Sequence, residues 1–261
     1  AVAGAVIAFI VYRILNGKKG KMLPVIKGLS ALWNKLVRAV YAFNRRFNNR
    51  FSDRMLHTTS FILIVAAWFA PYLAYFPGIL AYDSPVQFGM IFDGYMIDHH
   101  PIAHTELLKF FVNIGERYFG GANSGVAVYT MAQMLFLAYA YSRAVGAMRK
   151  KKVAPPLIIL CIVLAMFYPF NWYMAVSMTK DTIFTAFMVL CVTELLLLME
   201  EDRNYYTPDR YDIAFGISLV GGILFRNNFV YALVMLLLGL VIAMICSKKR
   251  AVMWQIGRAH V

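Results

Sequence analysis

Residues 56–76 decide the fold class of this chain; their sequence is LHTTSFILIVAAWFAPYLAYF. The stretch contains no Asp, Glu, Lys or Arg, and a helix of about 20 apolar residues is long enough to cross the hydrocarbon core of a bilayer. It ends in a cluster of aromatic residues with Pro71, and Pro77 follows, which is typical of the membrane–water interface. Backbone within lipid must satisfy its own hydrogen bonds, so we expect a membrane helix and an all-α protein.

Similar apolar runs recur along the chain, and 61% of its 261 residues are hydrophobic. The mean hydropathy of +0.62 excludes an ordinary soluble domain. We predict a polytopic transmembrane helical bundle of about seven spans. The predicted spans are residues 1–15 (truncated), 56–76, 122–142, 155–172, 182–199, 213–224 and 229–246. Cys161, Cys191 and Cys246 all lie within these spans, where we interpret them as small apolar packing residues.

Both ends of the sequence suggest a fragment. The chain starts at Ala1, inside an apolar run, and residues 256–261, IGRAHV, resemble one reading frame of a sequencing adapter. We therefore expect residues 1–255 to form a single transmembrane domain that continues beyond both ends, and residues 256–261 to be a scar of sequencing.

The charge distribution predicts the orientation. A net charge of +13 could suggest a nucleic-acid partner, but most Lys and Arg lie in short blocks between apolar runs, as the positive-inside rule requires of cytoplasmic segments. Apart from Arg258, only Lys109, Arg117, Lys180 and Arg226 of the 26 Lys and Arg fall in segments predicted to face outside. We expect a multi-pass protein of the cell membrane with no nucleic-acid partner.

Residues 16–55 form a basic cytoplasmic segment in this prediction. Apolar residues such as Leu32, Trp33 and Leu36 recur at helical spacing between Lys and Arg, which is typical of a helix lying against anionic headgroups. A solvated linker between two spans is the alternative.

Residues 77–121 form the predicted outer loop and hold most of the polar side chains that could do chemistry. Residues 101–119 are predicted to be an amphipathic interfacial helix, because they carry Glu106, Lys109, Glu116 and Arg117 among apolar residues. The candidate site residues of this loop are Tyr82, Asp83, Ser84, Gln87, Asp98, His99, His100 and His104.

Two further polar clusters are predicted on the same outer side, namely Lys180 with Asp181, and Arg226 with Asn227 and Asn228. Ionisable groups near membrane depth are costly and usually face a cavity or a partner. We therefore expect the clusters to share one outward-facing site lined by Asp83, His100, Lys180 and Arg226. The alternative is a local pair of Lys180 with Asp181, and an Arg226 that extends to lipid phosphate.

Four motifs carry a resemblance: PGxxxYDSxxQ from Pro77, DHHPxxHT from Asp98, TKD from Thr179 and FRNN from Phe225. Over roughly residues 56–246 the chain resembles a family of bacterial multi-pass membrane proteins of unassigned function that is similar to the GT-C superfamily glycosyltransferases. The resemblance implies sugar transfer from a polyprenyl-phosphate donor on the outer face, with Asp83 as the acidic residue of the first large outer loop. The usual GT-C acidic pair is absent, because Ser84 and Pro85 follow Asp83.

The residue types agree with such chemistry. A carboxylate can take the acceptor proton, for which Asp83 is the candidate, while Lys180 and Arg226 can stabilise a departing phosphate. His100 and His104, with Asp83 or Asp98, could instead hold a divalent metal ion, bind substrate, or serve the structure alone. Pro101 is expected at the first position of the following helix.

We expect a membrane glycosyltransferase of the bacterial cell envelope, acting on an extracytoplasmic cell-wall polymer or glycolipid. A transporter or flippase with an outward-facing polar site is the second hypothesis, and it should contain broken helices. A non-catalytic scaffold is the third.

Overall fold

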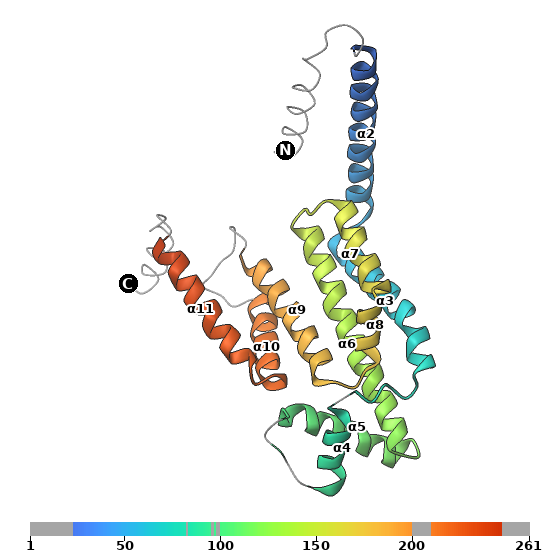
Figure 1. The fold of residues 1–261 in the computed structure, drawn as a ribbon, viewed down its shortest axis with the longest axis vertical. Helices are drawn as coiled ribbons and strands as arrows, with labels where there is room; N and C mark the ends of the chain where they lie inside the picture. Colours follow the sequence, from blue (N-terminus) through green and yellow to red (C-terminus); the bar gives the residue numbers. More distant parts are fainter. Residues whose placement is uncertain (1–22, 82, 95–96, 98–99, 200–209, 247–261) are drawn as a thin grey trace. The chain divides into compact units, whose positions relative to one another are not determined.

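The computed structural model describes residues 23–81, 83–94, 97, 100–199 and 210–246, and every element in these ranges is a helix (Figure 1). The prediction of an all-α protein is confirmed. The chain divides into two compact units, Ala1–Ser52 and Asp53–Val261.

The described part of the first unit is α2 (Leu23–Arg50). The apolar residues predicted at helical spacing lie on this helix, and Leu32, Trp33 and Leu36 are all more than half exposed. An exposed apolar stripe between Lys and Arg suits a helix at a membrane surface.

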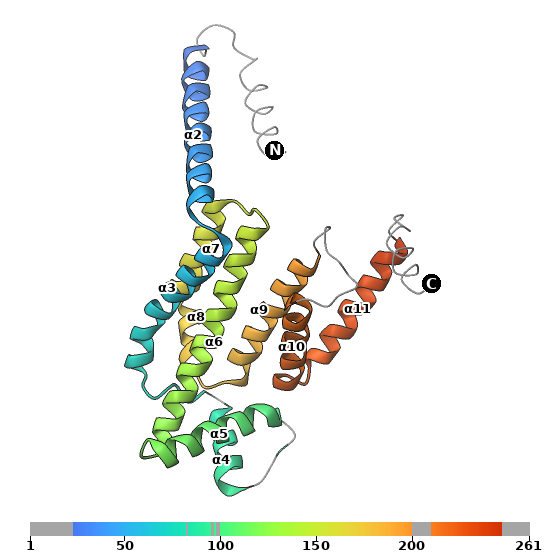
Figure 2. The same ribbon diagram turned by 180° about the vertical axis from the view of Figure 1, so that it is seen from behind.

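The second unit is organised around α6 (Ala122–Lys150), which packs against α3 (Asp53–Ala74), α5 (Ile102–Tyr118) and α9 (Lys180–Leu198) (Figures 1 and 2). Three shorter helices complete its surroundings: α4 (Ser84–Asp93), which contacts α5, and α7 (Pro155–Phe167) and α8 (Pro169–Val176), which contact α3 and α6. α10 (Arg210–Phe225) packs along α9 and contacts α11 (Phe229–Cys246). In both views α4 and α5 lie at the N-terminal end of α6.

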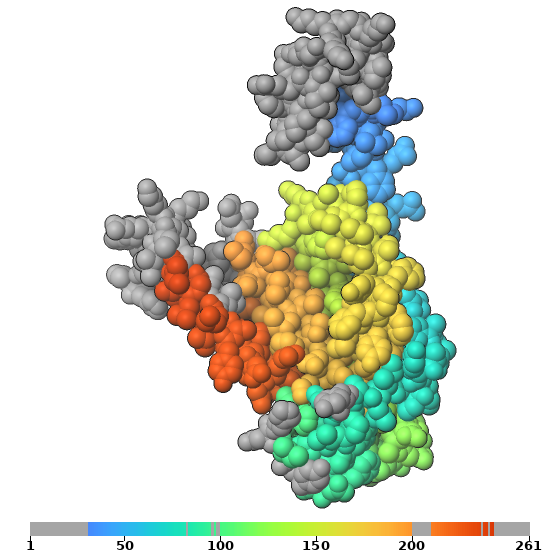
Figure 3. Space-filling model, in the orientation of Figure 1, coloured from blue at the N-terminus to red at the C-terminus, as the bar shows by residue number. Residues whose placement is uncertain are grey.

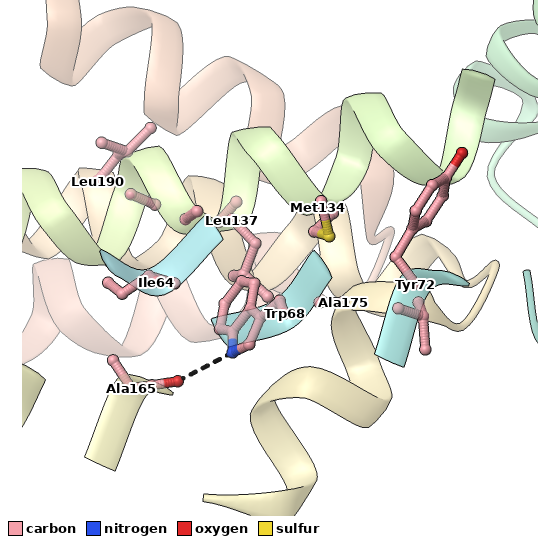
Figure 4. Packing of buried hydrophobic residues seen from close by; sticks show 12 residues of the cluster. Ile64, Trp68, Tyr72, Met134, Leu137, Ala165, Ala175 and Leu190 are labelled. Carbon is pink, nitrogen blue, oxygen red and sulfur yellow. Dashed lines mark hydrogen bonds between the residues drawn. The ribbon is translucent and has the colours of Figure 1, made fainter. Parts of the chain in front are cut away.

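The core of this unit lies where α3, α6, α8 and α9 meet (Figure 4). Its largest side chain is Trp68, which is fully buried and packs with Ile64, Met134 and Leu137. A buried indole N–H needs a hydrogen-bond acceptor. Trp68 Nε1 donates to the carbonyl of Ala165 at 3.1 Å.

Only Tyr168 separates α7 from α8, which begins at Pro169, and the two helices are bent by 50°. Because proline has no N–H, a continuous helix would leave the carbonyl of Ala165, four residues earlier, without its donor. Trp68 supplies that donor. Asn171 Nδ2 also donates at 3.0 Å to the carbonyl of Leu164, which accepts from the N–H of Tyr168 as well, so side chains bond to two carbonyls at the break.

Two glycines allow α5 and α6 to approach closely. A Cβ built on Gly125 would lie 2.2 Å from the carbonyl oxygen of Phe111, and one on Gly115 would lie 2.2 Å from the backbone nitrogen of Gly125. Backbone atoms cannot yield as a flexible side chain can, so this contact requires glycine on both helices.

By length and composition, two described helices can cross a membrane, α3 and α9, and a third span results if the bent pair of α7 and α8 counts as one. A membrane protein is therefore supported, but the prediction of about seven spans is not. α10 has only 16 residues, and α6 is long enough but carries polar side chains that it buries inside the unit, including Thr130 and Gln133. The predicted span 1–15 lies outside the described residues.

α11 exposes much of its apolar surface at the edge of the unit (red in Figure 3). Tyr231, Met235 and Leu237 are each more than 60% exposed. Such exposure suits a helix that contacts lipid.

Candidate functional site

Two non-helical segments meet at the end of the second unit where α9 begins. Ile79 and Ser177 form an isolated parallel bridge. The N–H of Ile79 donates to the carbonyl of Val176 at 2.9 Å, and the N–H of Met178 donates to that of Ile79 at 3.0 Å. This bridge brings the chain before α4 beside the chain before α9.

Side chains fix this junction further. Gln133 of α6 donates from Nε2 to the carbonyls of Ala175, at 2.9 Å, and Ser177, at 2.6 Å. The buried hydroxyl of Ser84 donates to the carbonyl of Met178. Ser84 therefore ties the two segments together through its hydroxyl, and its expected part in substrate binding stays a prediction.

The junction places Asp83 against Lys180. Lys180 Nζ donates to Asp83 Oδ2 at 2.6 Å, and the two side chains are 16% and 26% exposed. Asp83 is the N-cap residue of α4, but its carboxylate makes no capping hydrogen bond. Lys180 opens α9, where a cation opposes the helix dipole, so the carboxylate of Asp83 offsets an unfavourable position.

His100 completes this group from the chain before α5. Its Nδ1 lies 3.2 Å from Lys180 Nζ and 3.9 Å from Asp83 Oδ2, and the residue is 4% exposed. An ammonium group has donors and no acceptor. His100 Nδ1 therefore accepts from Lys180, which leaves the ring proton on Nε2.

Arg226 lies in the connection from α10 to α11 and contacts the first turn of α9. Its Nη1 donates to Asp181 Oδ1 at 2.6 Å, and its guanidinium carbon lies 5.2 Å from the ring centre of Phe184. Both members of this ion pair are about 40% exposed or more, so screening by water makes the pair weak.

The two ion pairs border one cavity of about 520 Å³. Its lining combines two carboxylates, two cations and two amides beside the N-terminus of α9, the positive end of the helix dipole. The lining residues are Asp83, Pro101, Lys180, Asp181, Arg226, Asn227 and Asn228. The structure thus brings together groups from four separate motifs of the sequence.

Gln87 and His104 belong to a buried network that also includes Tyr129. His104 Nδ1 lies 2.9 Å from Gln87 Oε1, and His104 Nε2 lies 2.6 Å from the hydroxyl of Tyr129. The amide oxygen can only accept, so Nδ1 carries the proton and Nε2 accepts from Tyr129. Gln87 Nε2 donates to Thr105 Oγ1 at 3.3 Å.

This network holds His104 neutral. Burial, followed by the positive charge of Lys180, lowers the pKa of His104 to about 3. His104 lies in α5, which is not among the candidate spans. The network ties α4, α5 and α6 together, so Gln87 and His104 have a structural role here, and their expected part in substrate binding stays a prediction.

The metal hypothesis finds no support in this geometry. Among the described residues, no group of three or more His, Cys, Asp and Glu could hold an ion. The one lone pair of neutral His104 is taken by Tyr129, and Nδ1 of His100 accepts from Lys180, so these side chains do not converge with Asp83 on a shared centre.

Three predicted site residues, Tyr82, Asp98 and His99, lie outside the described residues. Pro101 is the N-cap residue of α5 and not its first helical residue, which corrects a detail of the prediction. Sequence reasoning missed Gln133 and Tyr129, although a polar residue within a predicted span was the available signal.

Residues 91–258 match a family of unknown function, DUF6020. The chain belongs to this family. None of the curated proteins matches the chain, and no solved structure does.

The DUF6020 match includes His100, Lys180, Asp181 and Arg226, but it begins after Asp83. The cationic side of the cavity therefore lies within the family region, and Asp83 precedes it.

Proposed function

We propose that this chain is a membrane glycosyltransferase that moves a sugar from a polyprenyl-phosphate donor to an extracytoplasmic acceptor. The acceptor is a cell-wall polymer or a glycolipid of a bacterial envelope, and the enzyme resembles the GT-C superfamily. The single observation that supports this best is Asp83, held by Lys180 at the border of a cavity that also presents Arg226, Asn227 and Asn228.

The reaction needs a base and a stabilised leaving group. The acceptor oxygen attacks the anomeric carbon, the bond from that carbon to the phosphate oxygen breaks, and the acceptor proton goes to Asp83. The departing phosphate gains negative charge, which Arg226 and the N-terminus of α9 stabilise. Arg226 suits a phosphate because its planar fork offers two parallel donors.

Lys180 links the proposed base, Asp83, to the proposed binding of the donor phosphate. It donates to Asp83 and His100, and an ammonium group has three N–H donors. A donor phosphate in the cavity can take the remaining N–H of Lys180, and its negative charge offsets part of the ammonium charge, so the carboxylate of Asp83 becomes a better acceptor for the proton. Binding of the donor thus activates the base.

A second cavity offers room for the apolar part of a lipid donor. It measures about 240 Å³ and is lined mainly by aromatic and aliphatic side chains of α5, α6, α9 and α10, including Phe111, Ile183 and Phe225. Ile183 lies one helical turn after Lys180, and Phe225 directly precedes Arg226. Phosphate and lipid chain could therefore bind to adjoining parts of the same helices.

The test is transfer from a lipid-linked sugar by the full-length protein in membranes. Loss of a general base costs on the order of 10² to 10⁴ in rate, so Asp83→Asn should nearly abolish transfer. Asp93→Asn is the matched control, because Asp93 is exposed at the end of α4, before Gly94. Parental activity of Asp83→Asn would refute the proposal.

One observation favours a transporter or flippase as the second candidate. α7 and α8 form a bent pair with side chains bonding to two carbonyls at the break, and broken helices are typical of transporters. Lipid movement without glycosidic bond formation in reconstituted vesicles would favour this function over the first.

A further inference from the structure

Another polar cavity lies in the second unit, at the opposite end of α9 from the cavity at Asp83. It measures about 350 Å³ and lies between the start of α3, the last turns of α6, the end of α9 and the start of α10. Lys180 and Glu194, which mark the two cavities, are 14 residues apart on α9, which corresponds to about 21 Å along a helix. The two cavities therefore lie at opposite ends of α9, the helix shown in Figures 1 and 2, and are distinct.

Arg143 is fixed at this cavity by a buried acid. Its Nε and Nη2 donate to the two carboxylate oxygens of Glu194 at 2.7 and 2.8 Å. Glu194 is 2% exposed, so its charge requires this partner. These two hydrogen bonds fix the guanidinium group of Arg143, and its Nη1 takes no part in them.

Three cations lie around the ring of Tyr211. The guanidinium carbons of Arg210 and Arg143 lie 4.9 and 5.7 Å from the ring centre, and Lys150 Nζ lies 4.8 Å from it. The hydroxyl of Tyr211 accepts from Arg210 Nη2 at 2.9 Å and from Lys150 Nζ at 3.3 Å. One aromatic side chain from the start of α10 therefore orders basic groups from two helices.

The lining of this cavity carries more cations than acids. Burial alone would raise the pKa of Tyr211, but the hydrogen bonds and charges of Arg210 and Lys150 outweigh it and lower the pKa. Arg54 adds a fourth cation to the lining, against the two acids Asp53 and Glu194, and Glu194 is already matched by Arg143.

Like charges gathered at a cavity repel one another, and an anion that enters removes this repulsion. Guanidinium forks and an ammonium group are the side chains that recognise phosphate. A volume of about 350 Å³ falls at the low end of the range for ligand pockets, which begins at roughly 300 Å³. The basic blocks of the sequence predict this end to face the cytoplasm.

We propose that this cavity binds a phosphate-bearing anion, at a site separate from the proposed transfer site. The phosphate contacts Lys150, Arg210 and Arg54, while Arg143 and Tyr211 hold the cluster in shape. The same chemistry is offered by the headgroup of an anionic lipid and by a soluble phosphate compound, and the experiment separates the two sources.

The test uses the purified full chain in phosphatidylcholine nanodiscs and follows its thermal unfolding midpoint. Pyrophosphate is titrated against chloride at matched ionic strength, and in a second arm the fraction of phosphatidylglycerol is raised instead. A saturable rise with pyrophosphate identifies a soluble ligand, because a ligand that binds only the folded state stabilises it. A rise with phosphatidylglycerol, to which pyrophosphate adds nothing, identifies a lipid headgroup.

Substitutions in this cavity test whether it is the site that binds the probe. The double variant Lys150→Gln with Arg210→Gln should lower the affinity for whichever probe raises the midpoint by about tenfold or more, because hydrogen bonds between charged groups are the strong ones. Lys109→Gln is the control, because it removes an exposed cation from α5. The proposal is overturned if neither probe raises the midpoint, or if the double variant responds as Lys109→Gln does.

A double variant that fails to fold leaves the test intact. Single Lys150→Gln and Arg210→Gln variants, and Tyr211→Phe, which keeps every charge and removes the shared acceptor, then replace it. Each should weaken the probe, and unchanged binding in all three overturns the proposal.

Discussion

Lys180 Nζ lies 2.6 Å from Asp83 Oδ2, although the two residues are 97 positions apart in the sequence. The contact depends on the bridge between Ile79 and Ser177, which aligns the segment before α4 with the segment before α9. A backbone contact outside the helices therefore decides which carboxylate meets which cation.

A double-mutant cycle on this pair should show coupling. Asp83→Asn and Lys180→Gln each leave a partly buried charge without its partner, whereas the double variant removes both charges. Residues in one ion-pair network commonly couple by about 0.5–3 kcal/mol, and we expect the free energy of unfolding to show coupling in this range.

The control for this cycle is the more exposed pair of Asp181 and Arg226, where screening by water should reduce the coupling to below about 1 kcal/mol. Equal coupling in the two pairs would contradict this interpretation. Denaturation of the purified protein in detergent, followed by tryptophan fluorescence, measures both cycles.

The sequence predicted the helices of the second unit well, because long apolar runs leave a chain in lipid no alternative to helix. Asp83, Lys180 and Arg226 were also expected to lie together, and they border one cavity, although the expectation rested on about seven alternating spans that the described helices do not support. α4 was missed, although Asp83 and Pro85 before a short apolar run, and Gly94 after it, are signals of helix ends.

The specific partners could not be predicted in this way. Whether His104 contacts metal, substrate or Tyr129 depends on the direction of side chains across three helices, which spacing does not encode. The pair of Arg143 and Glu194 was missed for a related reason. Glu194 lies in an apolar run, where a lone acid indicates a buried partner. The sequence does not show which residue that partner is.

His104 should make stability depend on pH. Its pKa in the folded protein, about 3, lies below the ordinary value of 6.5, so the unfolded chain binds the proton more tightly. The stabilisation by neutral His104 is complete above pH 6.5 and is lost as the pH falls from 6.5 towards 3, by up to about 1.4 kcal/mol per pH unit.

His104→Gln removes the titrating group and keeps both donor and acceptor capacity. Between pH 7 and pH 5, the thermal unfolding midpoint of this variant should therefore fall less than that of the parent protein. If the two proteins lost stability equally over this range, His104 would not be the group responsible.

Gly125→Ala should destabilise the second unit. The new Cβ would lie 2.2 Å from the carbonyl oxygen of Phe111, and overpacking of this kind costs typically about 1–3 kcal/mol. Gly216→Ala in α10 is the matched control, because a Cβ there meets nothing within 4 Å and alanine favours helix by about 1 kcal/mol. Unfolding midpoints should move in opposite directions, and a shift of the same sign in both would contradict the close-contact explanation.

The two ends of the second unit should lie on opposite sides of the membrane. The segments near Lys150 carry a basic block and the segments near Asp83 carry few cations, which the positive-inside rule assigns to the cytoplasm and the exterior, respectively. Asp93 and Lys151 are exposed in the structure, whereas Ser84 is buried and unsuited to labelling. In a variant without the three native cysteines, Asp93→Cys should therefore react with an impermeant thiol reagent in intact cells, and Lys151→Cys only after the membrane is opened. The reverse pattern would place the cavity at Asp83 in the cytoplasm, where an extracytoplasmic acceptor could not reach it, and the proposed sugar transfer would have to be abandoned.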